Sequence, residues 1–158
     1  EHLLARVVED TDNVEPAASS VAAMNLLRLW KYTQRDELRL AADGMIRRFG
    51  GIMEARPHAL PQMLCAARLA LGGGSEIVVT GDRDAAQAED FLVEINKRFL
   101  PEKTLIRLNN ENRPSLESII PWLKALPQGG KPLAYVCADF ACGLPSFTPE
   151  ALAEKLDG

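Results

Sequence analysis

Two cysteines stand five positions apart in the stretch AYVCADFACGLP, residues 134–145, directly after a short apolar run. Cys137 and Cys142 could form a reversible disulfide, bind a metal or simply be buried. Redox-active dithiols typically use C-x-x-C with the first sulfur at a helix N-terminus. The four intervening residues, with Pro145 and Pro149 delaying the next helix, break that geometry. Because Cys is often simply buried, we favour packing and keep the disulfide and the metal site as alternatives.

The sequence gives little support for a metal site or for the catalytic triad of a hydrolase. A structural zinc site needs about four ligands, and Cys65, His58 and His2 are the chain's only other cysteine and histidines. No Ser stands in a nucleophile-elbow context, so a hydrolase triad cannot be assembled. We predict neither a metal site nor a cofactor.

Polar residues follow three predicted strands, EIVVTG (76–81), KTLIRL (103–108) and LAYVC (133–137). In open α/β sheets, ligands bind beyond the carboxyl ends of the strands. A single Gly follows the first strand rather than G-x-G-x-x-G or a P-loop, so the phosphate-binding signal is weak. The alternative is that Asp82 or Asp84 caps the next helix. The predicted ligand-binding crevice is formed by Thr80, Gly81, Asp82, Arg83, Asn109, Asn110, Cys137, Ala138 and Asp139.

An acidic run, EDTDNVE, places four carboxylates close together: Glu9, Asp10, Asp12 and Glu15. An EF-hand is excluded, because Glu15 stands where the loop needs Gly and Val21 stands where it needs Glu. Paired carboxylates could instead do glycosidase-type acid and base work. A solvated loop is the interpretation we favour.

The apolar pattern divides the chain in two. Residues 20–32 are apolar nearly all round, residues 35–51 carry one apolar stripe that ends at Gly50-Gly51, and a third helix covers 59–71. Short connections make these helices antiparallel neighbours. GGGS at 72–75 marks a boundary, so we predict a helical segment over 1–73 and a second unit over 74–158.

The second unit alternates strands with helices at about 83–99, 115–126 and 149–156, the middle one broken or restarted at Pro121. Such alternation implies parallel strands joined by right-handed crossovers. The fold class is therefore α/β overall, with antiparallel helices followed by a small three-stranded parallel α/β unit.

Composition narrows the classes of function. The chain has 158 residues, 47% of them hydrophobic and 25% charged, with a net charge of -4. This charge opposes nucleic-acid binding, which needs a basic surface. No apolar run approaches the ~20 residues that span a bilayer, and no signal peptide is visible. Three cysteines suit a reducing compartment, so we expect a cytoplasmic protein, cut from a longer chain.

Four stretches together, EDTDNVEPAASSVAAMNLLRLW, EIVVTGDRD, FLPEKTLIRL and AYVCADFACGLP, resemble the C-terminal end of the spermatogenesis-associated protein 20 family of thioredoxin-domain proteins. The resemblance covers nearly the whole chain in the same order. Departures occur at Ala17, Ser19 and Ala138, where the family pattern usually has Ser, Asn and Glu. These losses of polar groups oppose a catalytic role for the turn at 15–20 or for the cysteine loop.

The resemblance implies a longer parent protein with an N-terminal thioredoxin-like domain and a central (α/α) toroid, similar to six-hairpin glycosidases and sugar epimerases. The first 73 residues would then be the last helices of that toroid. The family's redox motif lies in the thioredoxin-like domain, outside this chain, so its activity does not carry over. A sugar-directed activity would be an analogy of fold, and fold does not fix function.

We favour a non-catalytic C-terminal portion that completes the toroid and packs or binds through its α/β unit, with the rest of the parent chain as partner. The alternative is part of a carbohydrate-active enzyme, with Glu15, Ser20 and Asn25 near the toroid mouth. A third hypothesis makes Cys137 and Cys142 a thiol relay for the thioredoxin-like domain. Because three helices cannot close a toroid, we also expect the isolated chain to self-associate.

Overall fold

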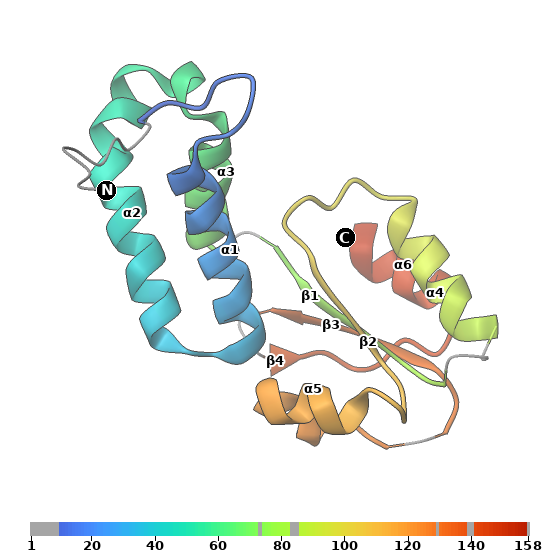
Figure 1. Ribbon diagram of the computed structural model, residues 1–158. Coiled ribbons are helices and arrows are strands. Elements are labelled where there is room, and N and C mark those ends of the chain that lie inside the picture. The colour runs from blue at the N-terminus through green and yellow to red at the C-terminus, as the bar shows by residue number, and fades with distance from the viewer. Residues whose placement is uncertain (1–9, 73, 83–85, 129, 139–140, 158) are drawn as a thin grey trace. The chain divides into compact units, whose positions relative to one another are not determined.

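The computed structural model describes residues 10–72, 74–82, 86–128, 130–138 and 141–157 (Figure 1). It divides into two compact units, with the change near residue 73. Residues 31–33, the last turn of the first helix, count in the second unit. Among the described residues, no helix is long and apolar enough to cross a membrane.

The first unit is helical, as the sequence predicts. Its buried core joins apolar side chains of three helices, among them Leu27, Phe49 and Met63. The elements are α1 (Ala18–Thr33), α2 (Asp36–Ala55), the 3-10 turn η1 (Pro57–Ala59) and α3 (Pro61–Ala70).

The helix α2 runs past Gly50-Gly51, so the predicted stop there is wrong. Ile52 and Met53, the two residues that follow these glycines, pack against the helical core. Their burial outweighs the roughly 1 kcal/mol by which each Gly disfavours a helix. The helix ends instead just before Pro57, whose ring disfavours helical geometry in the residue that precedes it.

The second unit is a four-stranded mixed sheet with helices on both faces, in the strand order β2-β1-β3-β4. β1 and β2 are parallel, whereas β3 is antiparallel to β1 and β4 is antiparallel to β3. Its elements are β1 (Glu76–Thr80), α4 (Ala86–Asn96), β2 (Thr104–Leu108), α5 (Arg113–Ile119), the 3-10 turn η2 (Pro121–Ala125), β3 (Leu133–Ala138), β4 (Ala141–Cys142) and α6 (Pro149–Asp157).

The predicted three-stranded parallel arrangement is therefore wrong for β3. The connection from β2 to β3 is broken at Pro121 into α5 and η2, as the sequence indicates. Arg113, at the start of α5, donates hydrogen bonds to the carbonyl oxygens of Leu126 and Pro127, at the end of η2. The connection thus returns to the end of the sheet where it began, and β3 has to run back antiparallel to β1.

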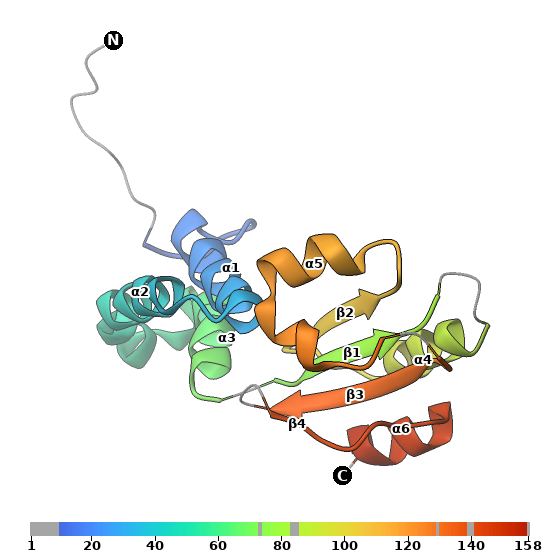
Figure 2. The same ribbon diagram turned by 90° about the horizontal axis from the view of Figure 1, so that it is seen from below.

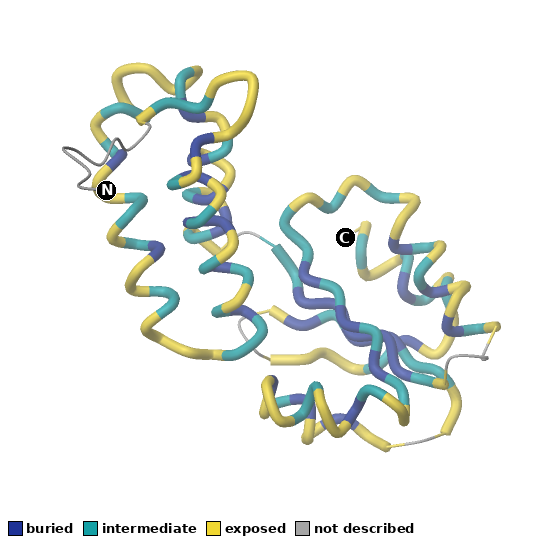
Figure 3. Tube along the Cα trace, viewed as in Figure 1, coloured by how far each residue is buried: buried dark blue, intermediate teal, exposed yellow. Residues whose placement is uncertain are grey.

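Two apolar cores cover the two faces of the sheet. α5 lies on one face, and α4 and α6 lie on the other (Figure 2). Val78 points into the α5 core, while its neighbours Ile77 and Val79 point into the α4 core. β1, in the middle, is buried along its whole length (Figure 3).

Candidate functional site

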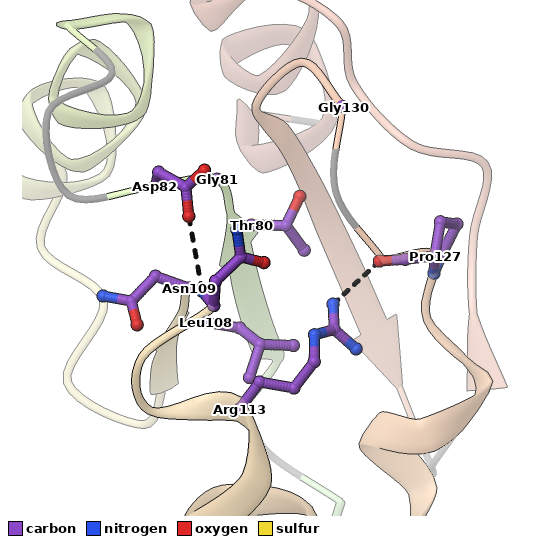
Figure 4. Close-up of a pocket in the computed structure, with 9 residues that line it drawn as sticks. Thr80, Gly81, Asp82, Leu108, Asn109, Arg113, Pro127 and Gly130 are labelled. Carbon is purple, nitrogen blue, oxygen red and sulfur yellow. Dashed lines mark hydrogen bonds between the residues drawn. The ribbon is translucent and has the colours of Figure 1, made fainter.

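A small pocket lies at the carboxyl ends of β1 and β2 (Figure 4). The parallel register pairs Thr80 with Leu108, so the residues that follow both strands meet at one edge. The structure brings together five residues of the predicted crevice and adds four that the sequence analysis missed. The pocket is lined by Thr80, Gly81, Asp82, Leu108, Asn109, Asn110, Arg113, Pro127 and Gly130.

The polar groups around this pocket largely bond to one another. Arg107 donates to the carbonyl oxygens of Gly81 and Asp82, at 2.7 and 3.0 Å. Asn109 and Asn112 exchange hydrogen bonds between backbone N–H and side-chain oxygen, at 2.9 and 2.8 Å. The cavity has a volume of about 10 Å³, enough for about one water. The pocket as it stands cannot admit a sugar.

Two residues of the pocket have clear structural roles. The buried Arg113 holds the start of α5 to the end of η2 through its bonds to the carbonyl oxygens of Leu126 and Pro127, and it also donates to Glu117 on α5 itself, at 2.9 Å. The carboxylate of Asp82 accepts from the backbone N–H of Asn110, at 3.4 Å. That contact joins the ends of β1 and β2. The other predicted cap, Asp84, and the predicted crevice residue Arg83 lie outside the described residues.

Cys137 does not belong to this pocket, which corrects the crevice prediction. Because β3 is antiparallel, Leu133 pairs with Thr80, whereas Cys137 pairs with Glu76 at the other end of β1. Ala138 lies at that other end as well, and Asp139 lies outside the described residues.

The two cysteines of the opening motif form a disulfide in this structure, so the favoured interpretation of simple packing is wrong and the disulfide alternative holds, because the β3–β4 register places the two residues opposite each other. Cys137 on β3 and Cys142 on β4 are direct cross-strand partners, with 3.9 Å between their Cα atoms. Cys137 is 1% exposed, whereas Cys142 is exposed. Cys65 and His58 are exposed residues of the helical unit, and His2 lies outside the described residues. Within the described parts of the chain, no cluster of three His, Cys, Asp or Glu could hold a metal.

A buried ion pair lies beside the disulfide. Lys31 donates from Nζ to Oε1 of Glu76 over 2.6 Å, and these residues are 5% and 1% exposed. The strand register places Thr104, Glu76, Cys137 and Cys142 side by side across the four strands. Glu76 Oε2 and Thr104 Oγ1 are buried and have no hydrogen-bond partner among the described residues.

The sequence analysis missed this row, although one signal was present. Glu76 opens a strand whose next three residues are apolar, and a charged residue is rarely buried unless it is paired. Its partner Lys31 is 45 positions away in sequence. On the same sheet face, burial raises the pKa of Tyr135 and so favours its neutral hydroxyl.

In the helical unit, the weak catalytic candidates do not converge. Ser20 is 0% exposed, and its hydroxyl has no hydrogen-bond partner among the described residues. Asn25, five residues further along α1, is exposed, as is Glu15. A buried hydroxyl and two exposed groups do not form one accessible site.

Asp12, from the acidic run, has a structural role instead. One carboxylate oxygen accepts from the backbone N–H of Ala17 at 2.8 Å, and the other accepts from that of Gln62 at 2.8 Å. Those N–H groups lie at the N-termini of α1 and α3, where donors lack helical partners and a negative charge is favourable. Asp12 thus holds two helix starts together.

Comparison with known proteins places the chain in a family. It is 31% identical over 152 residues to human spermatogenesis-associated protein 20 and 30% identical over 154 residues to an uncharacterized protein of Caenorhabditis elegans. These matches cover 96% and 98% of this chain but 19% and 21% of the relatives. The chain therefore spans about a fifth of their length. No protein-family model and no solved structure matches it. By this similarity along nearly its whole length, the chain belongs to the spermatogenesis-associated protein 20 family.

Proposed function

We propose that this chain is a non-catalytic C-terminal portion of a larger protein, in which its helices complete an (α/α) toroid and its α/β unit packs or binds. The observation that carries the proposal is the outer face of α1. Val21 and Leu29, which lie two turns apart with Asn25 between them, are 38% and 49% exposed. A helix that is apolar nearly all round is typical of a position surrounded by other helices.

The rest of the parent protein is the occupant we propose for this face. The relatives are about five times as long as this chain, so helices that could cover α1 have ample sequence from which to come. Further apolar side chains, Leu40 on α2 and Leu71 after α3, are exposed in the same unit. Large exposed apolar surfaces commonly mark interaction sites.

A catalytic role for this chain alone has less support. The strand-end pocket has room for about one water, and its polar groups serve the fold. Glu15, Ser20 and Asn25 do not share an accessible surface. A sugar-directed activity would therefore depend on residues elsewhere in the parent protein. The predicted cytoplasmic location remains part of this proposal.

Paired measurements on the isolated chain and on its full-length parent test the proposal. Replacing Val21 and Leu29 together with Glu should change the stability of the isolated chain by no more than about 0.5 kcal/mol, because both side chains already contact solvent. In the parent, the same change should lower the Tm by several degrees, since two charges would enter an apolar interface. Val93→Glu, on an exposed position of α4, is the matched control. An unchanged parent Tm would contradict the proposal.

The same face predicts how the isolated chain associates. We expect self-association at high concentration, measured by light scattering, and its loss in the double Glu variant. A strictly monomeric wild-type chain at high concentration would contradict the prediction that this face of α1 drives self-association.

A further inference from the structure

The disulfide on β3 and β4 combines three features beyond those needed for packing. Its two cysteines differ in access, because the residue Cys142 is exposed and the residue Cys137 is 1% exposed. The buried residue Cys137 stands directly opposite Glu76 in the antiparallel register. Glu76 in turn has one buried oxygen paired with Lys31 and one without a hydrogen-bond partner in the described structure.

We propose that Cys137 and Cys142 form a thiol–disulfide exchange site, in which Cys142 is the sulfur that partners attack, Cys137 is the resolving thiol and Glu76 is its proton acceptor. The partner is a low-molecular-weight or protein thiol in its reduced or disulfide form. This site is independent of the role proposed for the helical unit.

Access decides which sulfur reacts first. Exchange requires a thiolate to approach a disulfide sulfur along the S–S axis, so an incoming group can reach the exposed Cys142 and is screened from Cys137. In the reduced chain, the Cys142 thiol therefore gives its proton to water, and its thiolate attacks the partner disulfide and forms a mixed disulfide. One partner sulfur leaves with the electron pair of the broken bond and takes up a proton from water.

The second step needs a proton acceptor inside the fold. The thiolate, not the thiol, is the nucleophile, and Cys137 has little access to water. Directly opposed residues in antiparallel strands have Cβ atoms about 4.5–5.5 Å apart, and these two side chains extend from the same face of the sheet. The carboxylate of Glu76 is therefore the nearest acceptor that the strand register supplies to the Cys137 thiol.

The closing reaction balances as follows. Cys137 gives its proton to Glu76, and its thiolate attacks Sγ of Cys142. The bond between the two cysteines forms, the bond between Cys142 and the partner breaks, and the partner leaves as a thiolate that takes up a proton from water. Glu76 releases its proton to water and is a carboxylate again. In total, the reduced chain and one partner disulfide give the oxidised chain and two partner thiols. Reduction by thiols follows the same steps in reverse.

Lys31 is a positioning residue in this scheme. Its ammonium group holds Oε1 of Glu76 at 2.6 Å, which leaves Oε2 as the oxygen able to receive a proton. Thr104, on the other side of Glu76, also has a buried oxygen without a hydrogen-bond partner among the described residues. Buried polar atoms without partners are uncommon in native proteins, and a proton-transfer role explains the one on Glu76.

Mixing the reduced chain with oxidised glutathione tests the order of attack. All proteins carry Cys65→Ser, because Cys65 is an exposed free thiol. Mass spectrometry of quenched samples should show a transient glutathione adduct at Cys142, followed by the internal disulfide. Cys137→Ser should retain the adduct, and Cys142→Ser should react at least tenfold more slowly. Two results would overturn the proposal: equal reactivity of the Cys137→Ser and Cys142→Ser chains, or no internal disulfide in the chain that carries Cys65→Ser alone.

The proton acceptor is tested by the rate of closure from the Cys142 adduct. Glu76→Gln should slow closure about tenfold or more, since a positioned general base typically contributes about 10² to 10⁴. Glu76→Asp should restore part of the rate, and Glu89→Gln, an exposed position on α4, is the matched control. If Glu76→Gln fails to fold, Lys31→Met combined with Glu76→Gln removes both charges and should still close slowly. Closure at the wild-type rate in a folded Gln variant would overturn the role of Glu76.

Discussion

The two ends of β1 differ in whether the polar groups near them have hydrogen-bond partners. At the carboxyl end, Thr80 donates to the carbonyl oxygen of Leu133 and accepts from its N–H, each at 3.2 Å, while Arg107 and Arg113 bond to nearby carbonyl oxygens. At the amino end, Glu76 and Thr104 keep buried oxygens that have no partner among the described residues. The polar residue at the carboxyl end of β1 is therefore paired, whereas the amino end keeps two buried oxygens side by side without partners in the described part of the chain; a further one, on Ser146, lies next to Ala134 of β3.

This difference shows that the expected position of a ligand site, at the carboxyl ends of the strands, depends on whether the strands are parallel. Ligands collect at the carboxyl ends of strands when helices connect parallel strands, and only β1 and β2 meet that condition here. The antiparallel β3 carries its final residues, including Cys137, to the opposite end. The reactive groups consequently gather away from the expected crevice.

The largest effect is expected from opening the buried ion pair. Lys31→Met leaves the Glu76 carboxylate buried without its partner and should lower the free energy of unfolding by about 3–5 kcal/mol. Lys31→Met with Glu76→Leu removes both charges and should recover most of that loss. Urea unfolding of the second unit can be followed by Trp122 fluorescence in a Trp30→Phe background, because Trp122 donates to the carbonyl oxygen of Tyr32 there. A single variant within about 1 kcal/mol of wild type would mean that the pair is effectively hydrated.

Glycines at the two ends of β1 provide a second contrast. Gly74 and Gly81 have φ angles of 88° and 124°, which side chains rarely adopt. A Cβ at Gly74 would overlap the backbone carbonyl oxygen of Glu102, whereas one at Gly81 would approach Pro132 Cγ at 2.9 Å. Gly81→Ala should cost about 1–3 kcal/mol, and Gly74→Ala should cost more because backbone has to move. Equal unfolding midpoints would contradict this order.

A smaller loss is expected from Arg113, near the carboxyl end of β1. Arg113→Met removes the hydrogen bonds to Glu117, Leu126 and Pro127 and should cost about 2 kcal/mol, typical of buried bonds to a charged group. Arg47→Met, at an exposed position of α2, is the matched control. The loss should appear in the Trp122 transition, since Arg113 holds η2. An effect equal to that of the control would show that the carbonyl groups find other donors.

Much of the local structure followed from the sequence. The helical periods, the three predicted strands and the break at Pro121 are confirmed, because each depends on neighbouring residues, whereas the short β4 was not predicted. The direction of β3 could not be predicted, since it depends on where the connection after β2 ends, and contacts such as those of Arg113 with the carbonyl groups of Leu126 and Pro127 are not visible in the sequence pattern. Likewise, burial of Ile52 and Met53 overrode the stop at Gly50-Gly51.

The candidate sites show the same division. Thr80, Gly81, Asp82, Asn109 and Asn110 do meet at one edge, because β1 and β2 are parallel. The sequence could not predict that Lys31 pairs with Glu76 or that Glu76 lies opposite Cys137. Both depend on strand register and on contacts between residues distant in sequence. The toroid remains a prediction, because it concerns residues outside this chain.

The smallest effect on stability is expected from the ion pairs of Arg98, whose partners lie on the helices α4 and α6 rather than at either end of β1. Arg98 bonds to Glu94 and Asp157, and these bonds hold the carboxyl pKa values below their ordinary 4.5 and 3.8. With depressed folded pKa values, the unfolded state binds more protons as the medium is acidified. The stabilisation is therefore present above the ordinary values and is lost as pH falls through the folded ones.

The side chain of Asp157 is 61% exposed and that of Glu94 is 16% exposed, so solvent screens the Asp157 pair most. The change between about pH 5 and about pH 3 should be modest and should shrink with added salt. Asp157→Asn should flatten the dependence of the urea midpoint on pH over that interval. Lys31→Met should leave the contribution of these pairs in place while lowering stability throughout. If the urea midpoint of Asp157→Asn changes with pH as that of wild type does, the pair of Arg98 with Asp157 contributes nothing to the pH dependence of stability. The contrast between buried and surface ion pairs would then depend on Lys31 and Glu76 alone.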